Sequence, residues 1–305
     1  MIQVFLVLWI IFALLLIGER KFARMIIYLS VFSLISSLCF LFFGAPDVAM
    51  AEAVISVFST IIFIVSFEKY YSHADQYAEG NNSSTAKNHI LAASMSLLLL
   101  VLFIAFIPKD IAFSSLKDQY LSDFAAEIGG KNSVTAIYLG YRLYDTLFES
   151  LMLLISMSAV IHLSWYTYFF ASQELYISIK HSQIAVYTIR IIGQILILVG
   201  FYVMINGHLS PGGGFQGGVI AASFFICRYM IFDMFDIPIG KVIKMEKIIY
   251  IGIVFVALSF ISVASDFGLS PHKTLYLIFM NLLIGMKVAC GFFILFFRFI
   301  AFERR

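Results

Sequence analysis

The sequence predicts an all-α, polytopic integral membrane protein with about nine transmembrane helices. Of its 305 residues, 62% are hydrophobic and only 12% are charged. A soluble protein carries roughly twice that share of charged residues. Apolar runs of about 18 or more residues recur along the chain, and each is long enough to cross a bilayer as a helix. Both observations exclude an ordinary soluble globular fold.

The apolar runs give the expected spans in order. The first is an anchor rather than a cleavable signal, because the basic cluster Arg20-Lys21-Phe22-Ala23-Arg24 follows the apolar run instead of preceding it. The nine expected spans are Ile2–Ile17, Met25–Phe43, Val48–Phe67, His89–Ile107, Thr146–Phe170 (or from Val134 as one bent helix), Ile184–Ile205, Phe215–Phe235, Ile248–Ala264 and Thr274–Ile300.

The distribution of basic residues predicts the orientation. Cytoplasmic loops of membrane proteins carry an excess of Lys and Arg. With nine spans, an N-terminus outside and a C-terminus inside satisfy this rule, and the turn between spans six and seven then faces outward. The basic residues expected inside are Arg20, Lys21, Arg24, Lys69, Lys87, Lys180, Lys241, Lys244, Lys247, Arg298, Arg304 and Arg305.

Two polar stretches, residues 68–88 and 171–183, divide the chain into three expected modules. The first is a three-helix module over residues 1–80, the second a two-helix module over 81–175, and the third a four-helix module over 176–305. Within the second, the polar residues 109–133 suggest a partly amphipathic segment outside the membrane.

The segment from Asn206 to Gly218, NGHLSPGGGFQGG, interrupts two apolar runs. Irregular backbone in a membrane protein must lie at a membrane face or be buried against protein. Pro211 is expected to end one helix, and glycines four residues apart at the start of the next would let a neighbouring backbone approach closely. A dinucleotide fingerprint is rejected despite the literal match, because no βαβ unit surrounds it. The expected packing glycines are Gly212, Gly213, Gly214, Gly217 and Gly218.

Ionisable residues inside the spans are the candidate functional residues. Each costs roughly 2.5–3.5 kcal/mol on insertion scales, so each needs a reason to be there. Glu52 lies one turn into the third span and Lys287 near the middle of the ninth. Arg142, Asp145 and Glu149 recur at spacings of three and four, which predicts one shared helix face. These groups line an ion pathway, or they form buried ion pairs that only fix how the helices dock.

The sequence offers no metal-binding cluster, cofactor motif or enzyme signature. Cys39, Cys227 and Cys290 are far apart within apolar runs and are expected to be small buried hydrophobic residues. They cannot hold an iron–sulfur cluster, which usually takes four cysteines. The expectation is therefore a chain that is not itself an enzyme and carries no cofactor.

Three segments resemble one family when they are taken in order. NGHLSPGGGFQGG at 206–218 is similar to the signature of the MrpB component of Mrp-type multisubunit Na+/H+ antiporters. GAPDVAMAEA at 44–53, whose Pro46 and Asp47 form a tight turn, resembles the C-terminal part of the large MrpA component and a small subunit of membrane-bound hydrogenases. GKNSVTAIYLGYRLYDTLFE at 130–149 resembles the piece that follows it. The chain resembles a fusion of three small membrane modules.

The resemblance implies a membrane subunit of a cation/proton antiporter in the cell membrane, beside large antiporter-like subunits and with Na+ and H+ as the transported ions. The ion-pathway candidates that it implies are Glu52, Arg142, Asp145, Glu149, His208 and Lys287. Two alternatives stay open: a coupling subunit of a redox-driven ion pump, and a purely structural assembly subunit.

Overall fold

The computed structural model describes residues 2–19, 21–70, 94–98, 100–101, 113–165, 182–229, 239–264 and 270–301. All regular elements in these ranges are helices. Six of these helices are long and apolar enough to cross a membrane. The predicted helical membrane fold is confirmed, and the chain is a multi-pass membrane protein. The number of nine spans and the N-outside orientation stay predictions.

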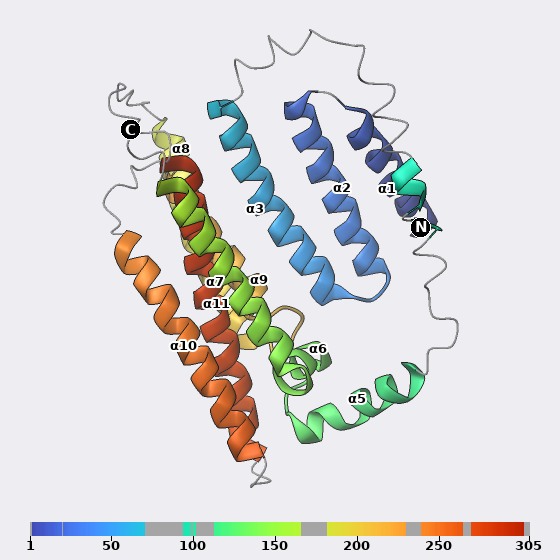
Figure 1. Cartoon of the computed structure of the whole chain (residues 1–305), viewed down its shortest axis with the longest axis vertical. Helices are drawn as coiled ribbons and strands as arrows, with labels where there is room; N and C mark the ends of the chain where they lie inside the picture. Colours follow the sequence, from blue (N-terminus) through green and yellow to red (C-terminus); the bar gives the residue numbers. More distant parts are fainter. Residues whose placement is uncertain are drawn as a thin grey trace.

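The first three helices form one layer (Figure 1). They are α1 (Ile2–Gly18), α2 (Phe22–Phe42) and α3 (Pro46–Tyr70), each within three residues of a predicted span at both ends. Gly44 makes the turn before α3 with a φ of 74°, a left-handed conformation that favours glycine. Pro46 then opens the helix, at the position where its missing N–H leaves no hydrogen bond unmade.

The middle of the chain contains a transverse helix and a broken one. In Figure 1, α5 (Phe113–Glu127) lies across the lower end of the bundle, where the sequence predicts an amphipathic external segment. It is followed by α6 (Ser133–Ala136), the π-helix η2 (Ile137–Tyr141) and α7 (Leu143–Trp165). The predicted bend in span five is therefore a π-helical turn. The predicted span His89–Ile107 lies mostly outside the described residues.

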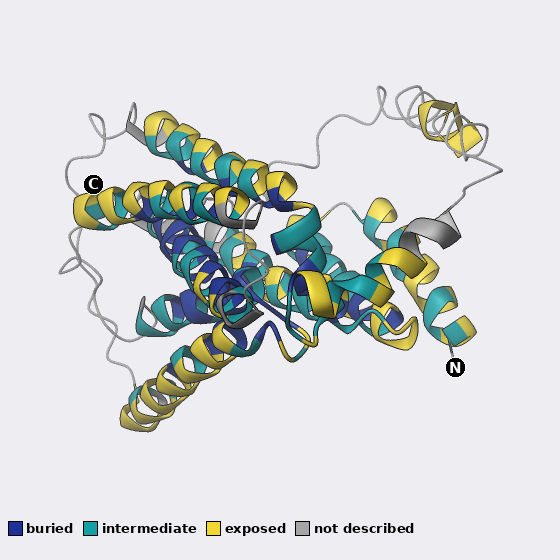
Figure 2. Ribbon diagram, turned by 90° about the horizontal axis from the view of Figure 1, so that it is seen from below, coloured by how far each residue is buried: buried dark blue, intermediate teal, exposed yellow. Residues whose placement is uncertain are grey.

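The C-terminal bundle is built around its last helix. It consists of α8 (Gln183–Asn206), α9 (Gly214–Tyr229), α10 (Ile239–Ala264) and α11 (Ser270–Ala301). In α11, 61% of the segment that is long enough to cross a membrane is buried inside the protein. In each of the other five candidate spans the buried share is at most 28%. Figure 2 shows the buried residues gathered on the inner sides of these helices. Helices α3, α7, α8, α9 and α10 all pack against α11.

The predicted start of a span at Ile248 is wrong, because α10 already begins at Ile239. The exposed Lys241 and Lys244 lie on the outer side of this helix. Lysine is a good helix former, so a basic run at a membrane boundary does not require a loop. This earlier start brings Glu246 into the helix, where its side chain is buried.

Candidate ion-pathway site

The glycine turn joins α8 to α9 and packs against α11. Gly212 has a φ of +114°, which a side chain would strain. A Cβ atom on Gly218 would lie 2.5 Å from the carbonyl oxygen of Gly285, and one on Gly217 would lie 2.7 Å from that of Gly200. The start of α9 is thus pressed against α11 on one side and α8 on the other. The backbones of three helices lie close together at the glycines that the sequence singles out.

The carboxylate of Asp47 binds this turn. Its Oδ1 atom accepts hydrogen bonds from the backbone N–H of Gly212 at 2.8 Å and from the side-chain amide of Asn132 at 3.2 Å. The same Asn132 nitrogen lies 3.1 Å from the oxygen of Gly207 and 2.9 Å from that of Ser210. Asp47 is buried. All three motif segments therefore meet in one hydrogen-bonded cluster, which we call the Asp47 cluster (Asp47, Asn132, Gly207, Ser210 and Gly212).

His208 contributes to this region mainly through its backbone. Its carbonyl oxygen accepts hydrogen bonds from the N–H groups of Lys131 at 2.8 Å and Asn132 at 3.0 Å. The imidazole ring is buried, and its Nδ1 atom lies 3.0 Å from the carbonyl oxygen of Ile205. The structure places His208 with the turn and does not bring it to the cavity that holds the charged residues.

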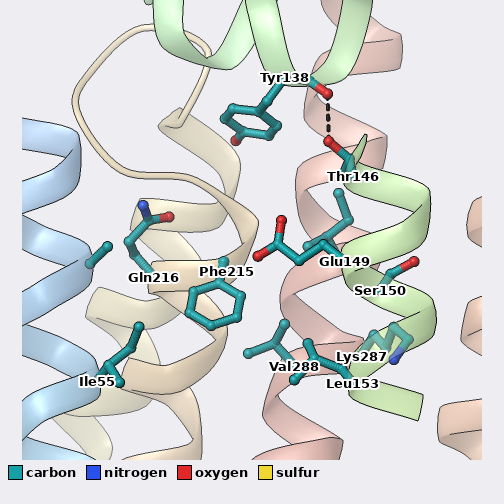
Figure 3. A pocket seen from close by; sticks show the side chains of 12 residues that line it. Ile55, Tyr138, Thr146, Glu149, Ser150, Leu153, Phe215, Gln216, Lys287 and Val288 are labelled. Carbon is teal, nitrogen blue, oxygen red and sulfur yellow. Dashed lines mark hydrogen bonds between the residues drawn. The ribbon is translucent and has the colours of Figure 1, made fainter. Parts of the chain in front are cut away.

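A cavity of about 330 Å³ lies between α3, η2, α7, α9 and α11. Figure 3 shows Glu149 of α7 directing its carboxylate into this cavity, and Lys287 of α11 at its lower edge with the ammonium pointing away from Glu149. The structure thus joins two of the predicted pathway residues. The polar residues that line the cavity are Tyr138, Thr146, Glu149, Ser150, Gln216 and Lys287.

Lys287 is paired with a residue that the sequence analysis missed. Its Nζ atom lies 2.7 Å from Oε1 of Glu246, and their side chains are 0% and 3% exposed. The ring of Tyr250 lies 5.7 Å from the same nitrogen. A signal for Glu246 was present in the sequence: it continues the stripe formed by Ile249 and Ile253 at helical spacing, both of which are buried.

Glu52 does not face the cavity. Its Oε1 accepts a hydrogen bond of 2.6 Å from Ser33 Oγ of α2. Its neighbours on α3, Ala51 and Ile55, line the cavity instead. The Glu52 carboxylate therefore lies at the contact between α2 and α3, apart from the Glu149–Lys287 pocket.

The predicted triplet is divided. Arg142 follows the π-helix η2 and pairs with Asp145, and their side chains are 64% and 57% exposed. Glu149 reaches the cavity, one turn further along α7. The backbone of Arg142 (φ −113°, ψ 34°) lies outside the helix, and its side chain still reaches Asp145, three residues further on.

Comparison with known families agrees with this architecture. Residues 184–294, which contain most of α8–α11, match the domain related to the MnhB subunit of the Na+/H+ antiporter. Residues 7–71, which contain most of α1–α3, match MbhD, which is one of the subunits of MBH. The predicted module boundaries near residues 80 and 175 lie outside the described residues and stay predictions.

Curated relatives match part of the chain. Proteins named "Putative antiporter subunit mnhA2" from Staphylococcus aureus strains JH9 and USA300 are 35% identical over 144 residues, which is 46% of this chain and 17% of theirs. The chain therefore spans about a sixth of the length of these relatives.

Two solved structures share the fold. The Mrp complex from Dietzia sp. DQ12-45-1b contains a chain that superposes with a TM-score of 0.76 and 18% identity, covering 97% of this chain and 34% of that one. A chain of the membrane-bound sulfane sulfur reductase, an archaeal respiratory membrane complex, superposes with a TM-score of 0.55 and 25% identity. The match covers 68% of this chain and 95% of that one. The chain is thus similar to antiporter subunits of the Mrp type, and it unites a region that matches MbhD and a region that matches the MnhB-related domain in one polypeptide.

Proposed function

We propose that this chain is a membrane subunit of a multisubunit Na+/H+ antiporter, and that Glu149 and Lys287 belong to its ion pathway. The observation that carries the proposal is the cavity that Glu149 of α7 and Lys287 of α11 both line. An ionisable side chain on a membrane helix costs free energy of insertion, so its presence there favours a function. Two such side chains at one cavity favour a role in transport.

The size and lining of the cavity suit a hydrated pathway. A water molecule occupies roughly 30 Å³ in the liquid, so a cavity of about 330 Å³ has room for several. Tyr138, Thr146, Ser150 and Gln216 offer them hydrogen-bonding groups. A water chain between Glu149 and Lys287 would carry protons. The exposed Arg142–Asp145 pair lies at the N-terminal end of α7, the helix that carries Glu149.

The chain is expected to work with other subunits in the cell membrane. The named relatives are far longer than this chain, and the Mrp complex that shares its fold is an assembly. Large antiporter-like subunits are the expected partners, and this chain would act in transport rather than as an enzyme. Glu52, at the α2–α3 contact, is the candidate for a second charged position along the route.

The test is Na+-dependent proton movement in vesicles that contain the whole complex. Glu149→Gln keeps the shape of the side chain and removes its charge, so antiport is expected to fall at least about tenfold while the complex assembles normally. The matched control is Asp118→Asn, which neutralises an exposed carboxylate on α5 and should leave antiport unchanged. Full antiport by Glu149→Gln would refute the proposal.

A coupling role in a redox-driven complex is the second candidate. The likeness to a chain of an archaeal respiratory membrane complex favours it, because this chain covers 95% of that one. Gentle detergent extraction of the tagged chain decides between the two. Antiporter-like subunits alone support the antiporter, and the same subunits with iron–sulfur or nickel proteins support the redox-driven complex.

A further inference from the structure

A second cavity lies between α8 and α9, apart from the proposed ion pathway. Its volume is about 350 Å³, and it shares none of its described lining residues with the cavity of Glu149 and Lys287. Cavities that bind small molecules have volumes of roughly 300–1,000 Å³. Two arginines and one glutamine line it, and its other described lining residues are apolar side chains, a glycine and a cysteine. The cavity therefore offers a place both to a charged group and to an apolar one.

Arg190 of α8 and Arg228 of α9 lie at the same level of the bundle. The two helices pack against each other on either side of the glycine turn, so they run in opposite directions. Arg190 stands 16 residues before Asn206, where α8 ends, and Arg228 stands 14 residues after Gly214, where α9 begins. Because an α-helix rises about 1.5 Å per residue, the two arginines are roughly 24 Å and 21 Å from the turn. The charged end of the cavity is therefore the end far from the turn.

This level corresponds to the headgroup region of a bilayer. The segment of α8 that can cross a membrane runs from Val186 to Asn206. Its length of roughly 31 Å is close to the roughly 30 Å of a hydrocarbon core. Arg190 is about one turn inside this segment, and Arg228 lies in the last turn of α9. Arginines so close to the boundary extend their guanidinium groups to the polar headgroups. The two charges therefore lie where lipid phosphates lie.

The cavity becomes apolar toward the middle of the membrane. After Arg190, Gln194 and Ile197 follow on the same face of α8 at spacings of four and three, and both line the cavity. On α9, Phe224 lies one turn deeper than the arginine of that helix. Gly193 lets the Phe224 ring approach α8, since an added Cβ atom would lie 3.0 Å from the ring. The order of charged, polar and apolar lining is the order of phosphate, ester and acyl chain in a phospholipid.

We propose that this cavity binds one anionic phospholipid, whose phosphate is held by Arg190 and Arg228 and whose acyl chain lies against the apolar wall. Arginine binds phosphate with two parallel hydrogen bonds. The Arg190 guanidinium lies 5.9 Å from the centre of the Tyr187 ring, and its five N–H donors still allow it to bind a phosphate.

The charge of the cavity selects the class of lipid. The described lining residues include two arginines and no carboxylate. The cationic part of a zwitterionic headgroup therefore finds no acidic partner among them, whereas a headgroup with a net negative charge is attracted. Basic pockets between membrane helices are typical sites for anionic headgroups on the cytoplasmic side. The predicted orientation, with the glycine turn outside, places this end of α8 and α9 on that side.

Cys227 can report whether the cavity is occupied, because it lines the cavity and is half-buried. The whole complex is purified and stripped of lipid in detergent, and labelling of Cys227 by N-ethylmaleimide is followed by peptide mass spectrometry. Phosphatidylglycerol, phosphatidylcholine or inorganic phosphate is added first. Phosphatidylglycerol is expected to slow the labelling at least about fivefold, and the other two less than about twofold. Equal protection by phosphatidylcholine, equal protection by phosphate, or no protection by phosphatidylglycerol would each overturn the proposal.

The double variant Arg190→Gln/Arg228→Gln tests the two guanidinium groups. It removes both charges and keeps polar side chains, so protection of Cys227 by phosphatidylglycerol is expected to fall below about twofold. The matched control is Lys241→Gln/Lys244→Gln, which removes two exposed positive charges from the start of α10 and should keep the full protection. A double variant that is protected as well as the wild type would overturn the proposal.

The comparison of the lipids on the wild-type chain needs no variant, so it decides the question even if the double variant does not assemble. Neither measurement records antiport. The lipid site can therefore fail while the proposed ion pathway holds, and the reverse is also true.

Discussion

The carboxylate of Asp47 in α3 accepts a hydrogen bond from the backbone N–H of Gly212, although 165 positions separate the two residues in the chain. The bond attaches the region matched by MbhD to the region matched by MnhB. Asn132, from the segment between them, donates to the same oxygen. The Asp47 cluster therefore explains how one folded unit can arise from regions that resemble separate subunits.

Two replacements of Asp47 should lower the stability of the fold to different degrees. Asp47→Ala leaves the buried N–H of Gly212 without an acceptor, which costs about 1–3 kcal/mol. Asp47→Asn keeps a carbonyl oxygen that can accept both hydrogen bonds, so its effect should be smaller. Thermal unfolding in detergent measures both. The expected order of midpoints is wild type, then Asp47→Asn, then Asp47→Ala, and equal midpoints for all three would contradict the role of the Asp47 cluster.

A methyl group on the packing face of α9 should separate it from α11. In Gly218→Ala the added Cβ would meet the carbonyl oxygen of Gly285 at 2.5 Å. Backbone cannot move as easily as a side chain, and such overpacking typically costs about 1–3 kcal/mol. The matched control is Gly252→Ala on α10, where nothing lies within 4 Å of the new atom.

The two alanine variants should have effects of opposite sign. Gly252→Ala is expected to be neutral or to stabilise its helix by up to about 1 kcal/mol, because alanine is a better helix former than glycine. Thermal unfolding of both variants in the same detergent measures the difference. A Gly218→Ala variant as stable as the control would show that α9 and α11 separate without cost.

The helices and the glycine contacts could be predicted from the sequence because both depend on local patterns. A long apolar run specifies a membrane helix wherever it lies, and glycines four apart present one smooth face. The contacts between segments could not be predicted, since nothing near Asp47 in the sequence indicates that Gly212 is its partner. The break at Arg142 was missed for another reason: the spacing of charges there assumes a continuous α-helix, and η2 interrupts it.

The predicted orientation places the glycine turn outside and the start of α10 inside. It is tested with Ser210→Cys and Lys241→Cys, each in a chain whose Cys39, Cys227 and Cys290 are changed to Ala or Ser. A membrane-impermeant maleimide added to intact cells should label Cys at 210. Labelling at 241 should appear only after the membrane is opened. The reverse pattern would invert the topology, and labelling of both positions in intact cells would contradict any odd number of crossings between them.

Glu52 offers a test in which charge and hydrogen bonding are separated. Glu52→Gln retains an oxygen that can accept from Ser33 Oγ, so the contact between α2 and α3 survives while the negative charge is lost. Ser33→Ala does the reverse, because it removes the donor and keeps the carboxylate.

If Glu52 lies on the ion route, Glu52→Gln lowers antiport at least about tenfold with normal assembly, since a neutral amide cannot exchange the ion. Ser33→Ala should then retain most of the transport, with a stability loss of about 0.5–1.5 kcal/mol. If Glu52→Gln transports normally and Ser33→Ala does not, Glu52 serves only to join the two helices.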